Sequence, residues 1–298
     1  MTTPILDKSG YGEISLKRNL SSPRTLFGLI MTGIAALFTL MAIVPLFIIL
    51  GYLITKGIGS LSASVFTELP PPPLVEGGGF GNAILGTIIM VGIGALISIP
   101  IGVMAAIYLS EFNEGKVAEW IRFATNVLSG VPSIIVGVFA YSAIVLTFKT
   151  YSAWAGGFAL SILMLPIIVR TTDESLKLVP QEVRQASVGI GANQYQTVLQ
   201  VVLPAALPAI ITGITLSIAR AAGETAPLLF TALFTQFWPN WDELFVEPTA
   251  SLAVLVYNFA IVPFKNQQEL AWGAAFILVL LVLITSIISR IATAKRTY

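Results

Sequence analysis

The sequence predicts an all-α membrane protein with six transmembrane helices. Of its 298 residues, 56% are hydrophobic and only 10% are charged, and the mean hydropathy is +0.88. A soluble domain usually carries roughly 25% charged residues, so this chain is predicted to lie in a bilayer. Six apolar stretches reach the roughly 20 residues that a helix needs to cross one. Lys and Arg are shared unevenly between the connections that join these stretches.

Each span is expected where an apolar run lies between polar or turn-forming residues. The first run is long enough to tilt in the bilayer, and the fourth becomes polar at its end. The expected spans are 25–54, 81–109, 121–148, 155–176, 204–234 and 270–291. A further apolar run at 252–262 is too short to span and is expected to lie at the interface or to re-enter the bilayer.

The basic residues predict the orientation, because cytoplasmic connections carry an excess of Lys and Arg. Only Lys56, Lys149 and Lys265 fall on one side of the six expected spans. The other side holds Lys8, Lys17, Arg18, Arg24, Lys116, Arg122, Arg170, Lys177, Arg184, Arg290, Lys295 and Arg296. We therefore expect residues 1–24 to form a cytoplasmic N-terminal tail, residues 25–298 to form the membrane domain, and both termini to lie in the cytoplasm.

The composition argues against several functional classes. The chain has no Cys and no His, which removes disulfides, the usual zinc sites and a histidine base. Its net charge of +1 gives no electrostatic case for binding nucleic acid. It has no Gly-x-x-x-x-Gly-Lys-Ser/Thr loop for ATP and no clustered carboxylates for a metal ion. We expect no enzyme activity, no cofactor and no metal site.

An Arg and a Glu lie inside the apolar fifth span. Charged residues in a span are costly and usually face a bundle interior or an aqueous path. Arg220 and Glu224 are four residues apart, so on a helix they share a face and neutralise each other. The guanidinium presents a fork of donors that suits a small oxyanion. When no anion is bound, the carboxylate of Glu224 would hold the guanidinium. Thr225 would add a hydroxyl, and Gly223 and Pro227 weaken the helix there. The alternative is a structural ion pair that locks helices together.

Other polar residues are weaker candidates for the path. Arg170 ends the fourth span and either marks the cytoplasmic edge or supplies a second cation at the inner mouth of the path. Asn126, Ser129 and Ser133 either line the path or bond across helices.

The connection between the fourth and fifth spans, at about 177–204, is polar and helix-compatible. Glycines at 189 and 191 divide it into two short helical pieces that form a projecting knob. Its pattern Gln185-Ala186-Ser187, Gly191 and Val201-Val202-Leu203-Pro204 resembles the EAA loop of ABC importer permeases. In that motif Glu-Ala-Ala precedes Gly and then Ile-x-Leu-Pro, so Gln185, Ser187 and Val201 are departures. The resemblance implies that this loop docks the cytoplasmic ATPase through the residues that occupy the positions of the motif. These residues are Gln185, Ala186, Ser187, Gly191, Leu203 and Pro204.

A narrower resemblance extends from about residue 81 to the end of the chain. The stretches 127–135, 165–176 and 219–232, and the closing Leu270-Ala271-Trp272-Gly273, are similar to A-type permeases of phosphate-specific ABC importers. Thr-Ala-Pro after Gly-Glu favours the A type over the similar C type. The resemblance implies the type I (MetI-like) permease fold in a prokaryotic plasma (inner) membrane. It also implies a C-type permease as heterodimer partner, two copies of an ATP-binding subunit and an extracytoplasmic phosphate-binding protein.

The resemblance favours phosphate import, driven by a separate ATPase, over other transport functions. Arg and Glu chemistry alone does not separate phosphate from sulfate or molybdate. A proton-coupled secondary transporter would use Glu224 as its proton carrier, but matching broken spans in the two halves are not seen. A membrane enzyme would need a catalytic constellation that the sequence lacks.

Overall fold

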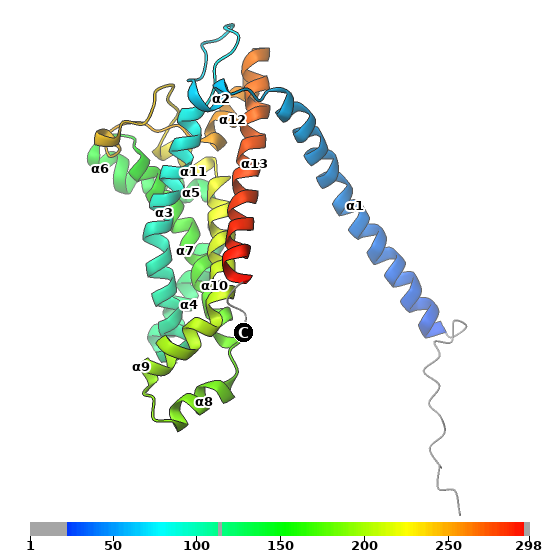
Figure 1. Cartoon of the computed structure of the whole chain (residues 1–298), viewed down its shortest axis with the longest axis vertical. Helices are drawn as coiled ribbons and strands as arrows, with labels where there is room; N and C mark the ends of the chain where they lie inside the picture. The colour runs from blue at the N-terminus through cyan, green and yellow to red at the C-terminus, as the bar shows by residue number, and fades with distance from the viewer. Residues whose placement is uncertain (1–22, 113–114, 295–298) are drawn as a thin grey trace, which may run out of the picture. The chain divides into compact units, whose positions relative to one another are not determined.

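The computed structural model describes residues 23–112 and 115–294 (Figure 1). The chain divides between Tyr52 and Leu53 into two units. The first unit contains most of helix α1 (Pro23–Gly59), an apolar helix of 37 residues that is long enough to span a membrane. Residues 1–22 of the tail expected at 1–24 lie outside the described residues. Helix α1 begins at Pro23, since proline is tolerated in the first turn of a helix.

The second unit is a bundle of helices and supplies the other candidate spans. Four further helices in the described chain are long and apolar enough to cross a membrane. They are α3 with its π-helical end (Gly81–Phe112), α7 (Ala153–Lys177), the continuous helix Gln194–Ala222, and α13 (Lys265–Ala294). A bent pair of helices supplies the sixth span when it is counted as one. The expected all-helical fold is confirmed, and the described chain has six spans when the bent pair is counted as one.

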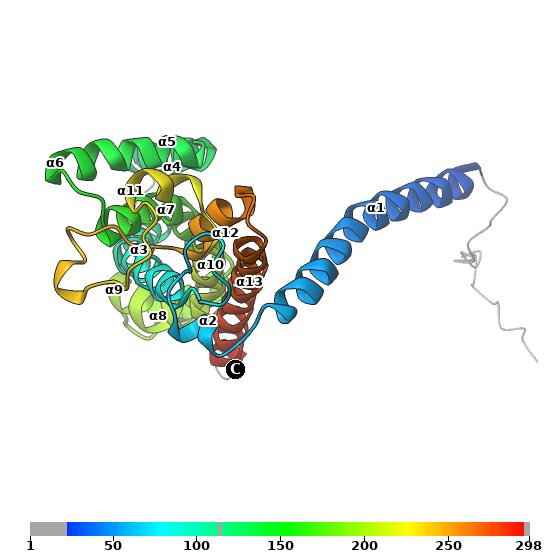
Figure 2. The ribbon, with the colours of Figure 1, turned by 90° about the horizontal axis from the view of Figure 1, so that it is seen from above.

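The third span is not the single helix expected at 121–148. Helix α4 (Lys116–Gly130) is followed by α5 (Ser133–Ala140), and the two parts of this span are bent by 105°. The residue before a proline is pushed out of the helical region, and Val131 before Pro132 is accordingly extended. Helix α5 continues to Phe148 through a π-helical turn and α6 (Leu146–Phe148). Figure 2 shows this segment along one side of the unit, beside α7 and α11.

The fifth span ends earlier than the expected 204–234. Helix α10 (Leu203–Ala222) stops at Gly223, and a separate helix α11 (Ala226–Thr231) follows. A proline clashes with the carbonyl four residues earlier, which for Pro227 is the carbonyl of Gly223, so the break falls where this clash requires it. At its other end α10 is continuous with a π-helical turn, Val198–Val202, and with α9 (Gln194–Thr197).

The loop between α11 and α12 (Leu252–Ile261) is fastened to the first two turns of α3. The side-chain amide of Asn82 donates to the carbonyls of Thr235 and Phe237, at 3.0 and 3.2 Å. The hydroxyl of Thr87 accepts from the backbone N–H of Leu252 at 2.9 Å. Helix α12 has 10 residues, so the apolar run at 252–262 is too short to span, as expected, and it packs against α3 and α13. Two short helices complete this end of the unit: α2 (Ser64–Thr67) and η4 (Trp241–Glu243).

The core runs between α3, α7 and α10, where the largest fully buried side chains include Met90, Leu160, Met164 and Ile168. Gly86 lets the loop before α12 approach α3, because a Cβ built there would overlap the carbonyl oxygen of Ala250. A backbone neighbour cannot rotate away as a side chain can. The close packing at this point therefore depends on the absence of a side chain.

Gly86→Ala is expected to lower stability by about 1–3 kcal/mol, the usual cost of forcing extra atoms into a packed interior. Gly92→Ala is the matched control on the same helix, because a Cβ at Gly92 meets nothing within 4 Å. The measurement is the midpoint of thermal unfolding in detergent. A midpoint for Gly86→Ala equal to that of Gly92→Ala would contradict the close packing described here.

Candidate functional site

Arg220 and Glu224 form an ion pair across the break between α10 and α11. Nε of Arg220 lies 3.5 Å from Oε1 of Glu224. Arg220 is in the last turn of α10, where a cation is favoured by the helix dipole. Glu224 is the second residue beyond the end of α10, but its backbone N–H still donates to the carbonyl of Ala221, so the expected spacing of four residues does bring the two side chains together.

The surroundings of this pair bear on the choice between a path and a structural lock. The side chain of Arg220 is 59% exposed in the isolated chain, while that of Glu224 is 16% exposed. The pair joins α10 to the segment directly after it and does not fasten α10 to a distant span. Thr225 lies beside it, half-buried, and its carbonyl accepts the first backbone hydrogen bonds of α11. This geometry leaves a guanidinium open to a ligand or a neighbouring subunit.

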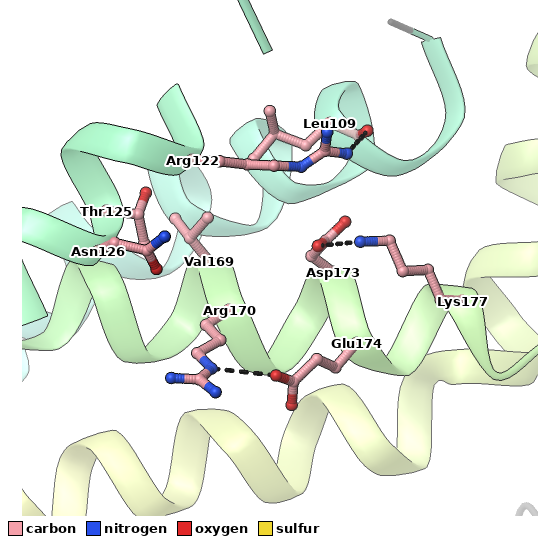
Figure 3. A pocket seen from close by; sticks show the side chains of 9 residues that line it. All are labelled: Leu109, Arg122, Thr125, Asn126, Val169, Arg170, Asp173, Glu174 and Lys177. Carbon is pink, nitrogen blue, oxygen red and sulfur yellow. Dashed lines mark hydrogen bonds and ion pairs between the residues drawn. The ribbon is translucent and has the colours of Figure 1, made fainter. Parts of the chain in front are cut away.

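Arg170 lines a polar cavity near the C-terminal end of α7 (Figure 3). The cavity has a volume of about 280 Å³. Two ion pairs along α7 form part of its wall: Arg170 Nε with Glu174 Oε1 at 3.0 Å, and Lys177 Nζ with Asp173 Oδ2 at 2.5 Å. The remaining lining residues come from the end of α3, from α4 and from α7, and they are Leu109, Arg122, Thr125, Asn126 and Val169.

Two buried polar atoms of the residues that line this cavity have no hydrogen-bond partner among the described residues. They are Nε of Arg122 and Oδ1 of Asp173. Arg122 does donate from Nη2 to the carbonyl of Leu109 at 2.8 Å. A buried donor or acceptor without a partner is costly, so water or a polar ligand would stabilise this cavity. Three cations and two carboxylates line it, which leaves an excess of one positive charge.

The structure does not bring Arg170 and Arg220 into one pocket. Neither Arg220 nor Glu224 or Thr225 lines the cavity that contains Arg170. Thr171, the neighbour of Arg170, packs against Gly213 on α10. Arg220 is seven residues further along α10, which is roughly 10 Å at about 1.5 Å per residue. The two cations therefore lie at different depths along the bundle.

The outcomes for the other candidate path residues differ. Asn126 lines the cavity that contains Arg170, and its predicted place in the path stays a prediction. Ser129 donates to the carbonyl of Thr125 in its own helix, so its hydroxyl is used locally. In the described segments 23–112 and 115–294, no group of three or more Asp and Glu residues comes together as potential metal ligands.

The connection at 177–204, called the coupling loop below, contains α8 (Gln181–Gly189) and α9. The two helices are joined through Gly191, whose φ of +94° is in the region that favours glycine. The hydroxyls of Ser187 and Thr197 lie 3.0 Å apart and tie the two helices together. Gln185 and Ala186 are exposed on α8, so they are available to a partner. The expected pair of helices with a glycine turn is confirmed.

Leu203 and Pro204 anchor the far end of the coupling loop. Leu203 packs against the buried cluster that contains Leu176, Val202 and Ile210. Pro204 is in the first turn of α10, where its missing N–H leaves a carbonyl of the preceding π-helical turn without its usual donor. These two residues therefore shape the base of the loop, and the exposed α8 offers its surface.

Sequence reasoning missed several residues that shape this end of the molecule. Asp173 and Lys177 are spaced four apart on a helix, a signal that was readable as an ion pair. Arg122 was counted only as a marker of orientation. Glu111 and Arg184 are 73 residues apart and form an ion pair of 2.7 Å, for which no local pattern exists.

Comparisons with known proteins agree with the fold. Residues 98–297 match the family described as binding-protein-dependent transport system inner membrane component. The chain is 43% identical to the phosphate transport system permease protein PstA of Haemophilus influenzae over 263 residues, which is 88% of this chain and 92% of that protein. It is 40% identical to PstA of Yersinia pestis over 246 residues, 82% of each protein.

The structural comparison gives the same fold at lower sequence similarity. A chain of the inward-facing MetNI methionine ABC transporter is similar with a TM-score of 0.58, 20% sequence identity, and coverage of 73% of this chain and 94% of that one. At this identity the similarity shows the fold alone. It confirms the expected fold of an ABC importer permease.

Proposed function

Because the chain belongs to the PstA family of phosphate transport system permeases, we propose that it forms the membrane path for inorganic phosphate in an ATP-driven importer. It is a transport subunit of the inner membrane, and ATP hydrolysis belongs to a separate subunit. The observation that carries this function is the 43% identity to a phosphate permease over 88% of the chain. This match favours phosphate over sulfate or molybdate, and a subunit of an ATP-driven importer over a proton-coupled transporter.

Arg220, Glu224 and Thr225 form one part of the proposed path. Arg presents donors in a fixed fork that matches the oxygens of phosphate, and it keeps its charge in a membrane. A fixed cation alone would hold a small anion too firmly for release. Glu224 at 3.5 Å competes for the guanidinium, so the site binds weakly enough to let the anion leave. Arg220 is exposed in the isolated chain, which fits a side chain that meets the path or the partner permease.

Arg170 and the polar cavity form the inner part of the proposed path. The cavity combines an excess positive charge with a buried donor, Nε of Arg122, that lacks a partner among the described residues. It lies at a different depth from Arg220, so an anion would pass from one charged layer to the next. Two weak sites in series suit conduction better than one strong site.

We infer that the coupling loop faces the cytoplasm and docks the ATPase. An ABC importer permease requires an ATPase on this side of the membrane and a substrate-binding protein on the other side. In Figure 1 α8 and α9 lie at the end of the unit where α13 finishes. Most described Lys and Arg of the second unit lie in the segments at this end, while Lys56, Lys149 and Lys265 lie in segments at the other. By the positive-inside rule this distribution supports the proposal that both termini lie in the cytoplasm. A C-type permease as partner and two copies of the ATPase complete the proposed assembly.

The test is transport by the native complex, purified with the subunits that accompany this chain and reconstituted in vesicles. ATP and the binding protein should drive uptake of labelled phosphate, and a tenfold excess of sulfate or molybdate should compete little. Uptake of sulfate or molybdate at the rate of phosphate would contradict the substrate. A phosphate uptake that needs a proton gradient and no ATP would contradict the mechanism.

A further inference from the structure

The coupling loop is held to the end of α3 by a second set of contacts, centred on Glu111. This residue lies in a π-helical turn, Tyr108–Phe112, that continues α3. Oε1 of Glu111 accepts from Nη2 of Arg184 at 2.7 Å, and Oε2 accepts from Nε of Arg184 at 3.3 Å. The two side chains are 9% and 15% exposed, respectively. A bidentate pair with so little exposure fixes orientation as well as distance.

Arg184 also holds the end of α7. It donates from Nη2 to the carbonyl of Leu176 at 2.9 Å and from Nη1 to the carbonyl of Val179. Leu176 lies in the last turn of α7 and Val179 lies two residues beyond its end, where helix carbonyls lack partners within the helix, so this guanidinium adds hydrogen bonds there while it binds Glu111. One side chain of α8 therefore connects the ends of two spans.

The second arm of the coupling loop contacts the same turn of α3. Gln194, the first residue of α9, donates from its side-chain amide to the backbone carbonyl of Glu111 at 2.5 Å. The ring of Tyr195 lies against the ring of Phe112, with centroids 4.9 Å apart. The coupling loop thus holds the 108–112 turn from both of its helices, and a displacement of the loop would displace this turn with it.

Helix α3 reaches from this turn to the opposite end of the unit. There Asn82 and Thr87 hold the loop between α11 and α12 by side-chain hydrogen bonds. Along its length α3 packs against α7, which carries Arg170 and the wall of the polar cavity. A movement of α3 would therefore reach the cavity and the far loop together.

We propose that Glu111 and Arg184 are positioning residues that couple the ATPase-docking loop to α3, and so convert movement of the coupling loop into opening and closing of the path. This proposal rests on the proposed function of the chain as an importer permease. It adds a specific mechanical connection: the loop acts on the second span through the Glu111–Arg184 pair, in addition to its covalent connections to α7 and α10. The pair contacts neither the anion nor ATP.

The test uses the reconstituted complex with Glu111→Gln. The amide keeps the shape of the side chain but removes the charge that binds Arg184. Phosphate transported per ATP hydrolysed should fall about tenfold, in the range typical of coupling between sites, while the ATPase still co-purifies and hydrolyses ATP. Glu119→Gln is the matched control, an exposed carboxylate on α4, and should keep the wild-type ratio. An unchanged ratio in Glu111→Gln would overturn the proposal.

A second variant covers the case in which Glu111→Gln fails to assemble. Gln194→Ala removes an exposed donor to the same turn and leaves the buried pair in place. It should lower the ratio about twofold to threefold, in line with a weaker contribution to coupling. A wild-type ratio in Gln194→Ala, with Glu111→Gln unassembled, would reduce the contacts to a structural role and overturn the proposal.

A probe on α3 separates failure of this proposal from failure of the proposed function. The chain has no Cys, so a cysteine that replaces Met104, an exposed residue of α3, can be labelled alone once the companion subunits are free of cysteine. ATP should change its fluorescence in the otherwise wild-type complex and change it much less in Glu111→Gln. This signal requires ATP but no phosphate, so it tests the connection even if another anion is the substrate. An equal response in both complexes would overturn the connection.

Discussion

Arg220→Gln should give an assembled complex that transports phosphate at least about 30-fold more slowly, the scale expected when one member of a charged hydrogen-bonding pair is removed. The amide keeps much of the length of the side chain but loses the charge and the fork. The measurement is phosphate uptake in vesicles, normalised to the amount of complex. Lys149→Gln is the control for removal of a cation at an exposed position in a loop and should transport at the wild-type rate.

Two further substitutions separate the roles within the pair. Arg220→Lys should retain part of the activity, because an ammonium supplies charge but does not reproduce the planar fork. Glu224→Gln should also slow uptake, for a different reason. Without the competing carboxylate 3.5 Å away, Arg220 holds the anion longer, so slower release should accompany unchanged or tighter binding.

The outcome for complex stability decides between the path and the structural lock. If the pair only fastens α10 to the segment after it, Arg220→Gln and Glu224→Gln should both reduce the yield and thermal stability of the complex. If Arg220 meets the anion, the yield should remain and the rate should fall. Near-normal uptake by an intact Arg220→Gln complex would return the pair to a structural role.

The number and approximate positions of the spans were predictable because a bilayer demands long apolar runs and the chain supplies them. The break at Pro132 was not, because proline has two outcomes in this chain. Pro100 and Pro166 lie inside α3 and α7, whereas Pro132 separates two helices bent by 105°. A proline is tolerated within a membrane helix when neighbouring groups satisfy the freed carbonyl. That depends on tertiary packing, which a local pattern does not contain.

The candidate site was predictable only where its residues lie close together in the sequence. Arg220 and Glu224 are close in sequence, so their contact followed from spacing even though Glu224 lies outside the helix. The polar cavity combines residues of three segments, and the Glu111–Arg184 pair joins positions 73 residues apart. Neither could be inferred from charge spacing, because each depends on how α3, α4 and α7 pack.

The departure of Ser187 from the EAA pattern acquires a reason only in three dimensions. A second alanine at this position would leave the hydroxyl of Thr197 without its partner at 3.0 Å, on the other helix of the coupling loop. Both side chains are buried, with 6% and 5% of their surface exposed. The serine therefore strengthens the connection across the glycine turn, and the motif departs from its usual residue where the loop has an internal hydrogen bond.

Gly191→Val should separate the ATPase from the permease or uncouple it. The space around Gly191 is open, since a Cβ there meets nothing within 4 Å, so the effect arises from the backbone alone. Its φ of +94° is strained for a residue with a side chain, at a cost of roughly 1–2 kcal/mol. A β-branched residue tolerates it least. The turn would adopt another conformation, and α8 would no longer present Gln185 and Ala186 in the same direction.

The design of this test depends on a neighbouring glycine. Gly189→Ala changes a glycine of α8 that also has open space but does not have a positive φ, so it should dock and couple as the wild type does. Gly191→Asn should be intermediate, because asparagine tolerates positive φ better than valine. The measurements are the amount of ATPase that co-purifies and the phosphate transported per ATP. Gly191→Val should lower the amount of ATPase that co-purifies or abolish the phosphate transport per ATP, whereas Glu111→Gln should leave the ATPase bound. Full binding and full coupling in Gly191→Val would show that the conformation of this turn does not position the docking surface.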